Sequence, residues 1–109
     1  MRRGDIYVVA VRGTYTGKPR PVVMVQDDRF AATASVTVCL LTTKPVEAPP
    51  TRIVVEPTVV TGIEQPSSIM VDTITTMPRV KVRDRLGHIT DADHVRFDRA
   101  LIVFLGLAE

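Results

Sequence analysis

Cationic side chains gather at two places in the sequence, and both are suited to binding a polyanion. Three surround the first long polar loop and four alternate with other residues in a later segment: Arg12, Lys18 and Arg20, then Arg79, Lys81, Arg83 and Arg85. If 79–85 is extended, the alternation sets its cations on one face of the strand. Such a face is either an ordinary solvated surface or a groove that follows phosphate groups, where arginine supplies paired hydrogen bonds.

The sequence lacks the parts of several common chemistries. His88 and His94 lie near Asp91 and Asp93, but this cluster matches no established spacing of metal ligands, and solvated side chains around a helix N-terminus explain it better. There is no glycine-rich phosphate-binding motif, no Cys-x-x-Cys pair and no Gly-x-Ser-x-Gly motif. We therefore expect no metal and no cofactor.

The elements that must position the cations are mostly strands, because runs rich in Val, Ile and Thr are separated by Gly, Pro and Asp. We predict extended runs at 6–11, 20–26, 35–43, 52–56 and 69–76, with an irregular crossing over 58–68. Pro21 has no N–H, so it belongs at the start of a strand or on a sheet edge. Lys44-Pro45 and Met77-Pro78 are each expected to stop a strand.

One helix is predicted near the C-terminus, over 91–105. Thr90 precedes acidic residues as a helix cap does, and the segment 100–105 is apolar all the way round. This pattern predicts burial on more than one side, by the sheet together with either a second subunit or other parts of the same chain. Several short strands and one terminal helix favour a mainly β (α+β) fold built as a small twisted barrel.

Length and composition narrow the possibilities further. With 109 residues the chain is long enough for one hydrophobic core, and we expect a single domain over 1–109. The longest apolar run, 100–105, is far shorter than the roughly 20 residues that cross a bilayer, and Met1–Asp5 lacks the apolar stretch of a signal peptide. We therefore expect no membrane contact and a cytoplasmic location. The lone Cys39 is expected to be a small buried apolar side chain, and a formal charge of +2 permits an anionic partner.

Several blocks of the sequence, in order, resemble the MazF/PemK toxin family. That family opens on R-G-D-I/V, continues through G-S/T-E and a short loop to R-P-V/A-V-V-V, and turns at N/D-D. The corresponding blocks here are Arg3-Gly4-Asp5-Ile6-Tyr7, Gly13-Thr14, and Gly17-Lys18-Pro19-Arg20-Pro21-Val22-Val23-Met24-Val25-Gln26-Asp27-Asp28. The segments 37–43 and 69–76 resemble the family's later strands, and the terminal helix completes a likeness over almost the whole chain.

The resemblance implies an SH3-like barrel, a homodimer, and metal-independent cleavage of single-stranded RNA at short sequences. It also implies a cognate antitoxin whose extended tail blocks the RNA groove. By position, Arg20 matches the family's catalytic arginine and Thr42 its catalytic threonine, with Thr43 adjacent. The predicted RNA-binding residues are Thr14, Tyr15, Lys18, Thr43, Asp72 and Thr73. Tyr15 and Thr73 stand where many members carry glutamate and glutamine, so the preferred bases cannot be carried over.

The chemistry expected of these residues is modest, because RNA carries its own nucleophile. The 2′-hydroxyl attacks the adjacent phosphorus, and an arginine at position 20 would stabilise the charge that develops there. The Thr42 hydroxyl could donate a hydrogen bond to the same phosphate. The resemblance also suggests that Arg20 relays a proton.

Two other readings stay open at this point. The same barrel family includes CcdB-like toxins that poison DNA gyrase by protein–protein contact without catalysis. A plain RNA-binding module, whose basic face holds RNA without cutting it, is the third. The pairing of Arg20-Pro21 with Thr42 favours the nuclease.

Overall fold

A computed structural model describes residues 1–10, 19–44 and 51–108 of the chain. Within these ranges the structure contains β1 (Asp5–Val9), β2 (Arg20–Met24), β3 (Ser35–Thr42), β4 (Arg52–Val55), β5 (Ser67–Met70), β6 (Thr75–Pro78), β7 (Val82–His88) and α1 (Asp91–Phe104), together with three short 3-10 turns, η1 (Asp28–Phe30), η2 (Val71–Thr73) and η3 (Arg79–Lys81).

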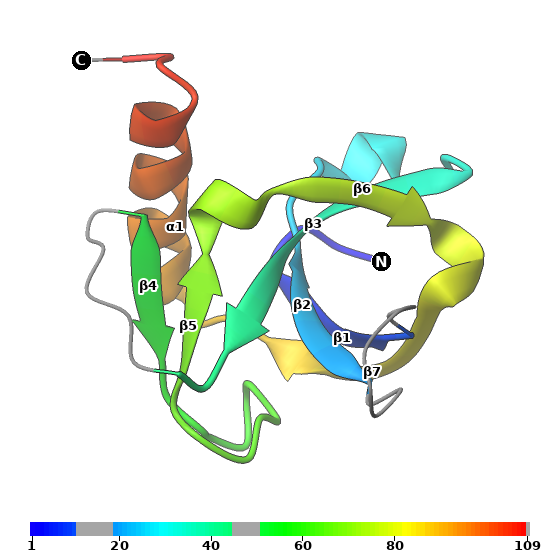
Figure 1. Cartoon of the computed structure of the whole chain (residues 1–109), viewed down its shortest axis with the longest axis horizontal. Coiled ribbons are helices and arrows are strands. Elements are labelled where there is room, and N and C mark those ends of the chain that lie inside the picture. Colours follow the sequence, from blue (N-terminus) through cyan, green and yellow to red (C-terminus); the bar gives the residue numbers. More distant parts are fainter. Residues whose placement is uncertain (11–18, 45–50, 109) are drawn as a thin grey trace.

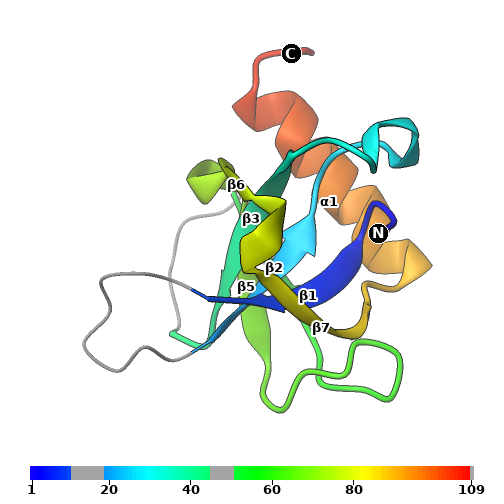
Figure 2. The same cartoon turned by 90° about the vertical axis from the view of Figure 1, so that its right-hand side faces the viewer.

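The strands form one antiparallel sheet in the order β4-β5-β3-β2-β1-β7, and β6 pairs with β3. The long strand β3 is shared, since its last residues pair with β5 and its first with β6. The strands curl around one another (Figures 1 and 2), and α1 packs against β4 and η2. No pairing among the described residues closes the sheet into a ring, but the arrangement is barrel-like. The predicted mainly β fold with a C-terminal helix is confirmed.

Two hydrophobic clusters fill the two faces of the sheet, because successive strand side chains point in opposite directions. On β2, Val23 belongs to the main cluster, which Phe97 and Leu101 of α1 complete, whereas Val22 and Met24 belong to the second cluster. Cys39 is fully buried in the main cluster, as predicted.

The segment 69–76 is not one strand, and that prediction is wrong. β5 ends at Met70, η2 turns the chain, and β6 continues through Pro78, although Met77-Pro78 was expected to stop the strand. The corner lets the chain leave one end of β3 and return along its other end. Pro78 is tolerated because, among the strands of the described residues, β6 pairs with β3 alone, so no second neighbour there requires its missing N–H.

The C-terminal helix begins as predicted. Thr90 is the N-cap, and its hydroxyl oxygen accepts a hydrogen bond of 3.2 Å from the Asp93 N–H. The helix ends at Phe104, and Gly106 follows in the left-handed region with φ +70°, where its N–H bonds to the Val103 carbonyl.

The apolar end of α1 is only half covered by its own chain. Ala100 and Leu101 are buried, but the following apolar residues are exposed: Ile102, Val103, Phe104, Leu105 and Leu107. Burial of all sides within one chain, one of the two alternatives considered above, is therefore wrong. The other alternative, coverage by a second subunit, stays a prediction.

Candidate active site

The strands β2 and β3 bring Arg20 and Thr42 to neighbouring strand ends on the same side of the sheet. Arg20 begins β2 and Thr42 ends β3, and these strands pair antiparallel through Val22 with Leu40 and Val23 with Cys39. Continued by two residues, this register sets Arg20 opposite Thr42. Residues 22 positions apart in the chain thus become neighbours across two strand ends.

Both side chains also lie on the same face of the sheet. Alternation along β2 gives Arg20 the face of Val22 and Met24, and alternation along β3 gives Thr42 the face of Val38 and Leu40. All four of these apolar residues belong to the second cluster or pack against it. Arg20 and Thr42 therefore mark the polar end of that face.

The Arg20 guanidinium is available to a ligand. It is exposed, and within the described part of the chain it has no hydrogen-bond or ion-pair partner. The two aspartates that follow the far end of β2 are engaged elsewhere: Asp27 pairs with Arg29, and Asp28 with Arg2. The hydrogen bonds from Arg29, from its backbone N–H first, hold the pKa of the Asp27 carboxyl below its usual range.

The Thr42 hydroxyl is oriented by the backbone that follows it. Its oxygen accepts a hydrogen bond of 3.2 Å from the Lys44 N–H. A hydroxyl that accepts in this way still has its own hydrogen to donate. Lys44 itself is exposed, and it adds a cation two residues beyond Thr42, where the sequence indicated only the end of a strand.

Two cavities open beside these strand ends. One, of about 190 Å³, is lined by Thr42, Thr43 and Lys44 together with residues of β4 and β5. The other, of about 500 Å³, has Thr43, Pro19 and Pro21 on one side and the loop residues 62–65 on the other. Thr43 lines both cavities, whereas Thr42 lines the smaller one.

The other predicted RNA-binding residues are not all brought to these strand ends. Thr14, Tyr15 and Lys18 lie outside the described residues. Asp72 and Thr73 lie in η2, away from both cavities, and each has a structural partner: the Asp72 carboxylate pairs with Arg52, and the Thr73 hydroxyl donates to the Met70 carbonyl over 2.7 Å.

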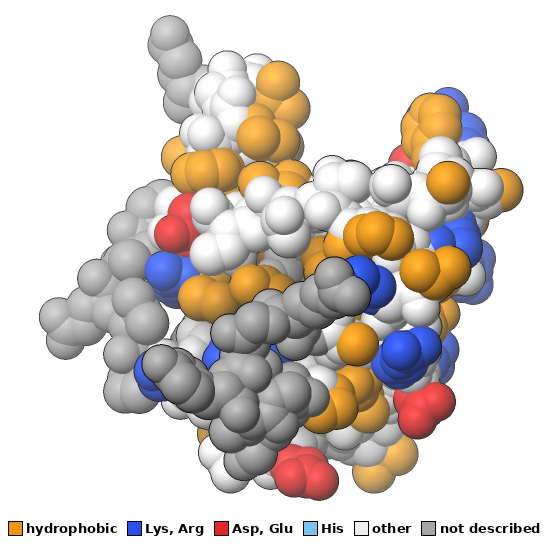
Figure 3. Space-filling model, turned by 45° about the vertical axis from the view of Figure 1, so that its right-hand side comes forward, with side chains coloured by type: hydrophobic (Ala, Val, Ile, Leu, Met, Phe, Trp, Pro, Cys, Tyr) orange, Lys and Arg blue, Asp and Glu red, His pale blue; other side chains and the backbone are white. Residues whose placement is uncertain are grey.

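The alternating cations near the C-terminus do not form one extended face. Arg79 and Lys81 lie in η3, and of the four cations Arg83 and Arg85 lie in β7, so the condition for a single cationic face, an extended segment over 79–85, is not met. Arg85 contacts the buried Asp5 at 3.2 Å, and this hydrogen bond raises the pKa of the Arg85 guanidinium. Lys and Arg side chains nevertheless spread along one side of the face seen in Figure 3, around hydrophobic side chains.

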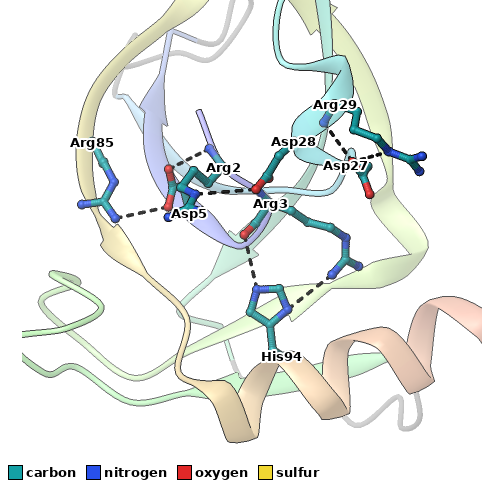
Figure 4. A network of polar contacts seen from close by, with 8 residues as sticks. All are labelled: Arg2, Arg3, Asp5, Asp27, Asp28, Arg29, Arg85 and His94. Atoms are coloured by element: carbon teal, nitrogen blue, oxygen red, sulfur yellow. Dashed lines mark hydrogen bonds and ion pairs between the residues drawn. The ribbon is translucent and has the colours of Figure 1, made fainter.

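His94 was expected to be solvated, but its ring contacts Arg3. Its ring lies between the backbone and the guanidinium of Arg3, with Nε2 3.3 Å from the Arg3 carbonyl oxygen and Nδ1 3.3 Å from Nη1 (Figure 4). Arg3 also pairs with Asp98 at 2.6 Å, so this network ties the N-terminal turn to α1. In 1–10, 19–44 and 51–108, no group of three or more His, Cys, Asp or Glu side chains is placed to hold a metal ion.

Of the helices in the described residues, none is long and apolar enough to cross a membrane.

Comparisons with known proteins show which proteins the chain resembles. Residues 2–105 match the family model of the PemK-like, MazF-like toxins of type II toxin–antitoxin systems. The chain is 58% identical, over 99% of both chains, to a protein of Mycolicibacterium smegmatis named a probable endoribonuclease MazF.

Solved structures share the fold. A mycobacterial endoribonuclease in complex with its cognate antitoxin has a TM-score of 0.84 at 24% identity, covering 100% of this chain and 98% of that one. A MazE–MazF structure from Deinococcus radiodurans has a TM-score of 0.79 at 14% identity, covering 99% and 98%.

Proposed function

The chain belongs to the PemK-like, MazF-like toxins of type II toxin–antitoxin systems and is an endoribonuclease of that family, and we propose that Arg20 and Thr42 cleave single-stranded RNA at the end of the β2–β3 pair. The observation that carries this proposal is an exposed arginine without a partner in the described residues, opposite a threonine hydroxyl that is free to donate, on one face of the sheet.

The reaction needs few groups from the protein. The 2′-oxygen of the RNA forms a bond to the adjacent phosphorus while the bond from phosphorus to the 5′-oxygen breaks, leaving a 2′,3′-cyclic phosphate and a 5′-hydroxyl. The 2′-oxygen loses a proton and the 5′-oxygen gains one, so no oxidant, metal or second substrate enters the balance. Negative charge concentrates on the phosphoryl oxygens in the transition state.

Arg20 is suited to that charge because its planar guanidinium presents several N–H donors in a fixed arrangement. Donors aimed at a developing oxyanion are worth about 3 kcal/mol each, or roughly a hundredfold in rate. Thr42 supplies a second donor, held in place by the Lys44 N–H. Protons lost and gained by the two ribose oxygens exchange with water through these groups.

Single-stranded RNA is the substrate that these strand ends suit, since sequence-specific readers need unstacked bases with exposed edges. Thr43 and Lys44 line the same cavity as Thr42, which supports a contact of both residues with the RNA. We propose that Thr14, Tyr15 and Lys18 contact the RNA as well, and that the protein acts in the cytoplasm as a homodimer inhibited by a cognate antitoxin. The exposed apolar residues 102–105 at the end of α1 support the second subunit.

The membership of the chain in this family favours a nuclease over a CcdB-like toxin that poisons gyrase. The decisive experiment incubates the purified protein with end-labelled single-stranded RNA in excess EDTA. We expect fragments that end in a 2′,3′-cyclic phosphate and a 5′-hydroxyl. Arg20→Ala should lower the cleavage rate about a hundredfold, whereas Arg99→Ala, which removes an exposed arginine of α1, should not change it.

Other outcomes would contradict the proposal. Intact RNA together with inhibited gyrase would indicate the CcdB-like activity. Retention of RNA without scission would indicate a binding module. Cleavage that disappears in EDTA and returns with a divalent cation would show that Arg20 and Thr42 do not cleave RNA without a metal ion.

A further inference from the structure

The cavity of about 500 Å³ has no role in the phosphate chemistry just described. Its size falls within the range of about 300–1,000 Å³ that is usual for sites of small organic molecules. One wall is apolar and continues the main core, because Ile63 and Leu86 both line the cavity and pack against that core. The remaining wall carries polar side chains from a loop, Glu64 and Gln65.

The cavity lies one residue away from each proposed catalytic side chain. Pro19 and Pro21 flank Arg20 in the chain, and Thr43 follows Thr42. Alternation along β2 gives Pro21 the face opposite to Arg20, so the end of β2 separates the cavity from the Arg20 side chain. A nucleotide that crosses this strand end can hold its phosphate on one side and its base on the other.

The loop that forms the far wall is held rigidly. The Val60 carbonyl accepts a hydrogen bond of 3.0 Å from the His88 N–H, and the Gly62 N–H donates to the Thr58 carbonyl over 2.9 Å. The Thr61 hydroxyl donates to the Glu56 carbonyl over 2.9 Å. The loop can pack closely against β7 because residue 87 is a glycine: a Cβ there would lie 2.1 Å from the Val60 carbonyl oxygen. The cavity is therefore formed before any ligand arrives, which lowers the entropic cost of binding. Figure 1 shows this β4–β5 loop at the same lower end of the molecule as the end of β3.

We propose that this cavity binds one base of the RNA next to the cut, and that Glu64 selects a base carrying an amino group over uracil. The inference rests on the nuclease function proposed above. A carboxylate only accepts hydrogen bonds, and the amino groups of cytosine, adenine and guanine donate them, whereas uracil presents two carbonyl oxygens beside its single N–H. Pro19, Pro21 and Leu86 supply the flat apolar contact that an unstacked base requires.

Gln65 positions the loop beside Glu64. Its carbonyl accepts a hydrogen bond of 3.0 Å from the Ser67 hydroxyl, and Ser67 is buried at the start of β5. The backbone between Glu64 and the sheet is thereby fixed. The carboxylate and the base edge can meet without a change in the loop.

The test compares cleavage of an RNA library that is randomised around the cut, followed by sequencing of the new ends, for the wild type and for Glu64→Gln. The amide of glutamine both donates and accepts, so it should tolerate uracil. We expect the wild type to disfavour uracil at one position about tenfold, and we expect Glu64→Gln to cleave RNA without that preference. The matched control is Glu56→Gln, which alters an exposed carboxylate of the same loop outside the cavity and should keep the wild-type profile.

Failure of the proposed base site and failure of the proposed nuclease function give different results. A wild-type profile in Glu64→Gln, or an equal loss of rate on all sequences, would overturn the base site and leave the nuclease standing. A loss of the uracil discrimination in Glu56→Gln as well would also overturn it, because the effect would then come from net charge. If the wild type cuts no RNA, the proposed function itself fails, and the base site fails with it.

Discussion

Arg52 and Asp72 face each other through two contacts, 3.0 Å from Nη1 to Oδ1 and 3.3 Å from Nη2 to Oδ2. Arg52 begins the edge strand β4, and Asp72 lies in η2, the corner between β5 and β6. The Arg52 side chain is only 14% exposed, so the Asp72 carboxylate offsets the cost of burying its charge. The pair therefore fixes the corner that turns the chain from one end of β3 to the other.

Replacing Asp72 with asparagine should destabilise the fold, because the guanidinium would remain largely buried without a counter-charge. We expect Asp72→Asn to lower the free energy of unfolding by about 2 kcal/mol in urea denaturation. Asp84→Asn, an exposed substitution in β7, should stay within about 0.5 kcal/mol of the wild type. A loss of RNA cleavage under conditions where Asp72→Asn is fully folded would instead support the RNA contact predicted for this residue.

Thr42 should act through its hydroxyl rather than through its shape. Thr42→Val keeps the branched side chain and removes the donor, so cleavage should fall about tenfold to a hundredfold, while Thr42→Ser should keep most of the activity. Single-turnover rates on one RNA would measure both. Thr75→Val, at an exposed position of β6, is the control. Equal activity of Thr42→Val and Thr42→Ser would remove Thr42 from the mechanism.

Gly87→Ala should test the close contact between β7 and the loop before β5. The new Cβ would meet the carbonyl oxygens of Val60 and Thr61 at 2.1 Å and 2.6 Å, and these backbone atoms cannot rotate away. We expect a loss of about 1–3 kcal/mol in the free energy of unfolding. Gly106→Ala meets no atom within 4 Å and should cost only the strain of its φ of +70°, about 1 kcal/mol. A smaller loss for Gly87→Ala than for Gly106→Ala would contradict the packing described above.

Cys39 should be chemically silent in the folded protein. Burial, and secondarily the nearby Asp72 carboxylate, raise the pKa of its thiol to about 12, so almost no reactive thiolate exists at pH 8. A thiol reagent at that pH should modify Cys39 only after unfolding in guanidinium chloride, and mass spectrometry would count the modified molecules. The raised pKa also means that this group's contribution to stability is complete below its ordinary pKa of 9.0 and is lost as the pH rises toward 12. Rapid labelling of the native protein would show that the core opens.

Local patterns in the sequence predicted most of the elements, because each pattern has a local physical cause. Thr90 caps α1 through a hydrogen bond to a residue three positions away. Runs rich in β-branched residues form β1, β2 and β3 close to the predicted bounds. Local patterns did not reveal η3. The alternation of cations over 79–85 is compatible with a strand, and nothing local to the segment shows that the chain turns there toward β7.

The catalytic candidates were predicted from the family resemblance, which gives their positions in the chain but not their positions in space. Pairing of β2 with β3 decides that Arg20 and Thr42 become neighbours on one face, since a shift of one residue in register would send one of them to the opposite side. The cavity beside them was not predicted at all. Glu64 and Gln65 lay in a segment expected to be an irregular crossing, and no spacing in the sequence links them to Pro19 or Thr43.

The sequence by itself determined most of the segments that extend, where the helix begins, and which family the chain resembles, because these depend on residues close together or on their order. Tertiary structure alone decided which charges are free. Asp27, Asp28 and Asp72 each have an arginine partner, and Arg20 has none among the described residues. Ion pairing depends on distances of a few ångströms between side chains that the chain brings together only when it folds.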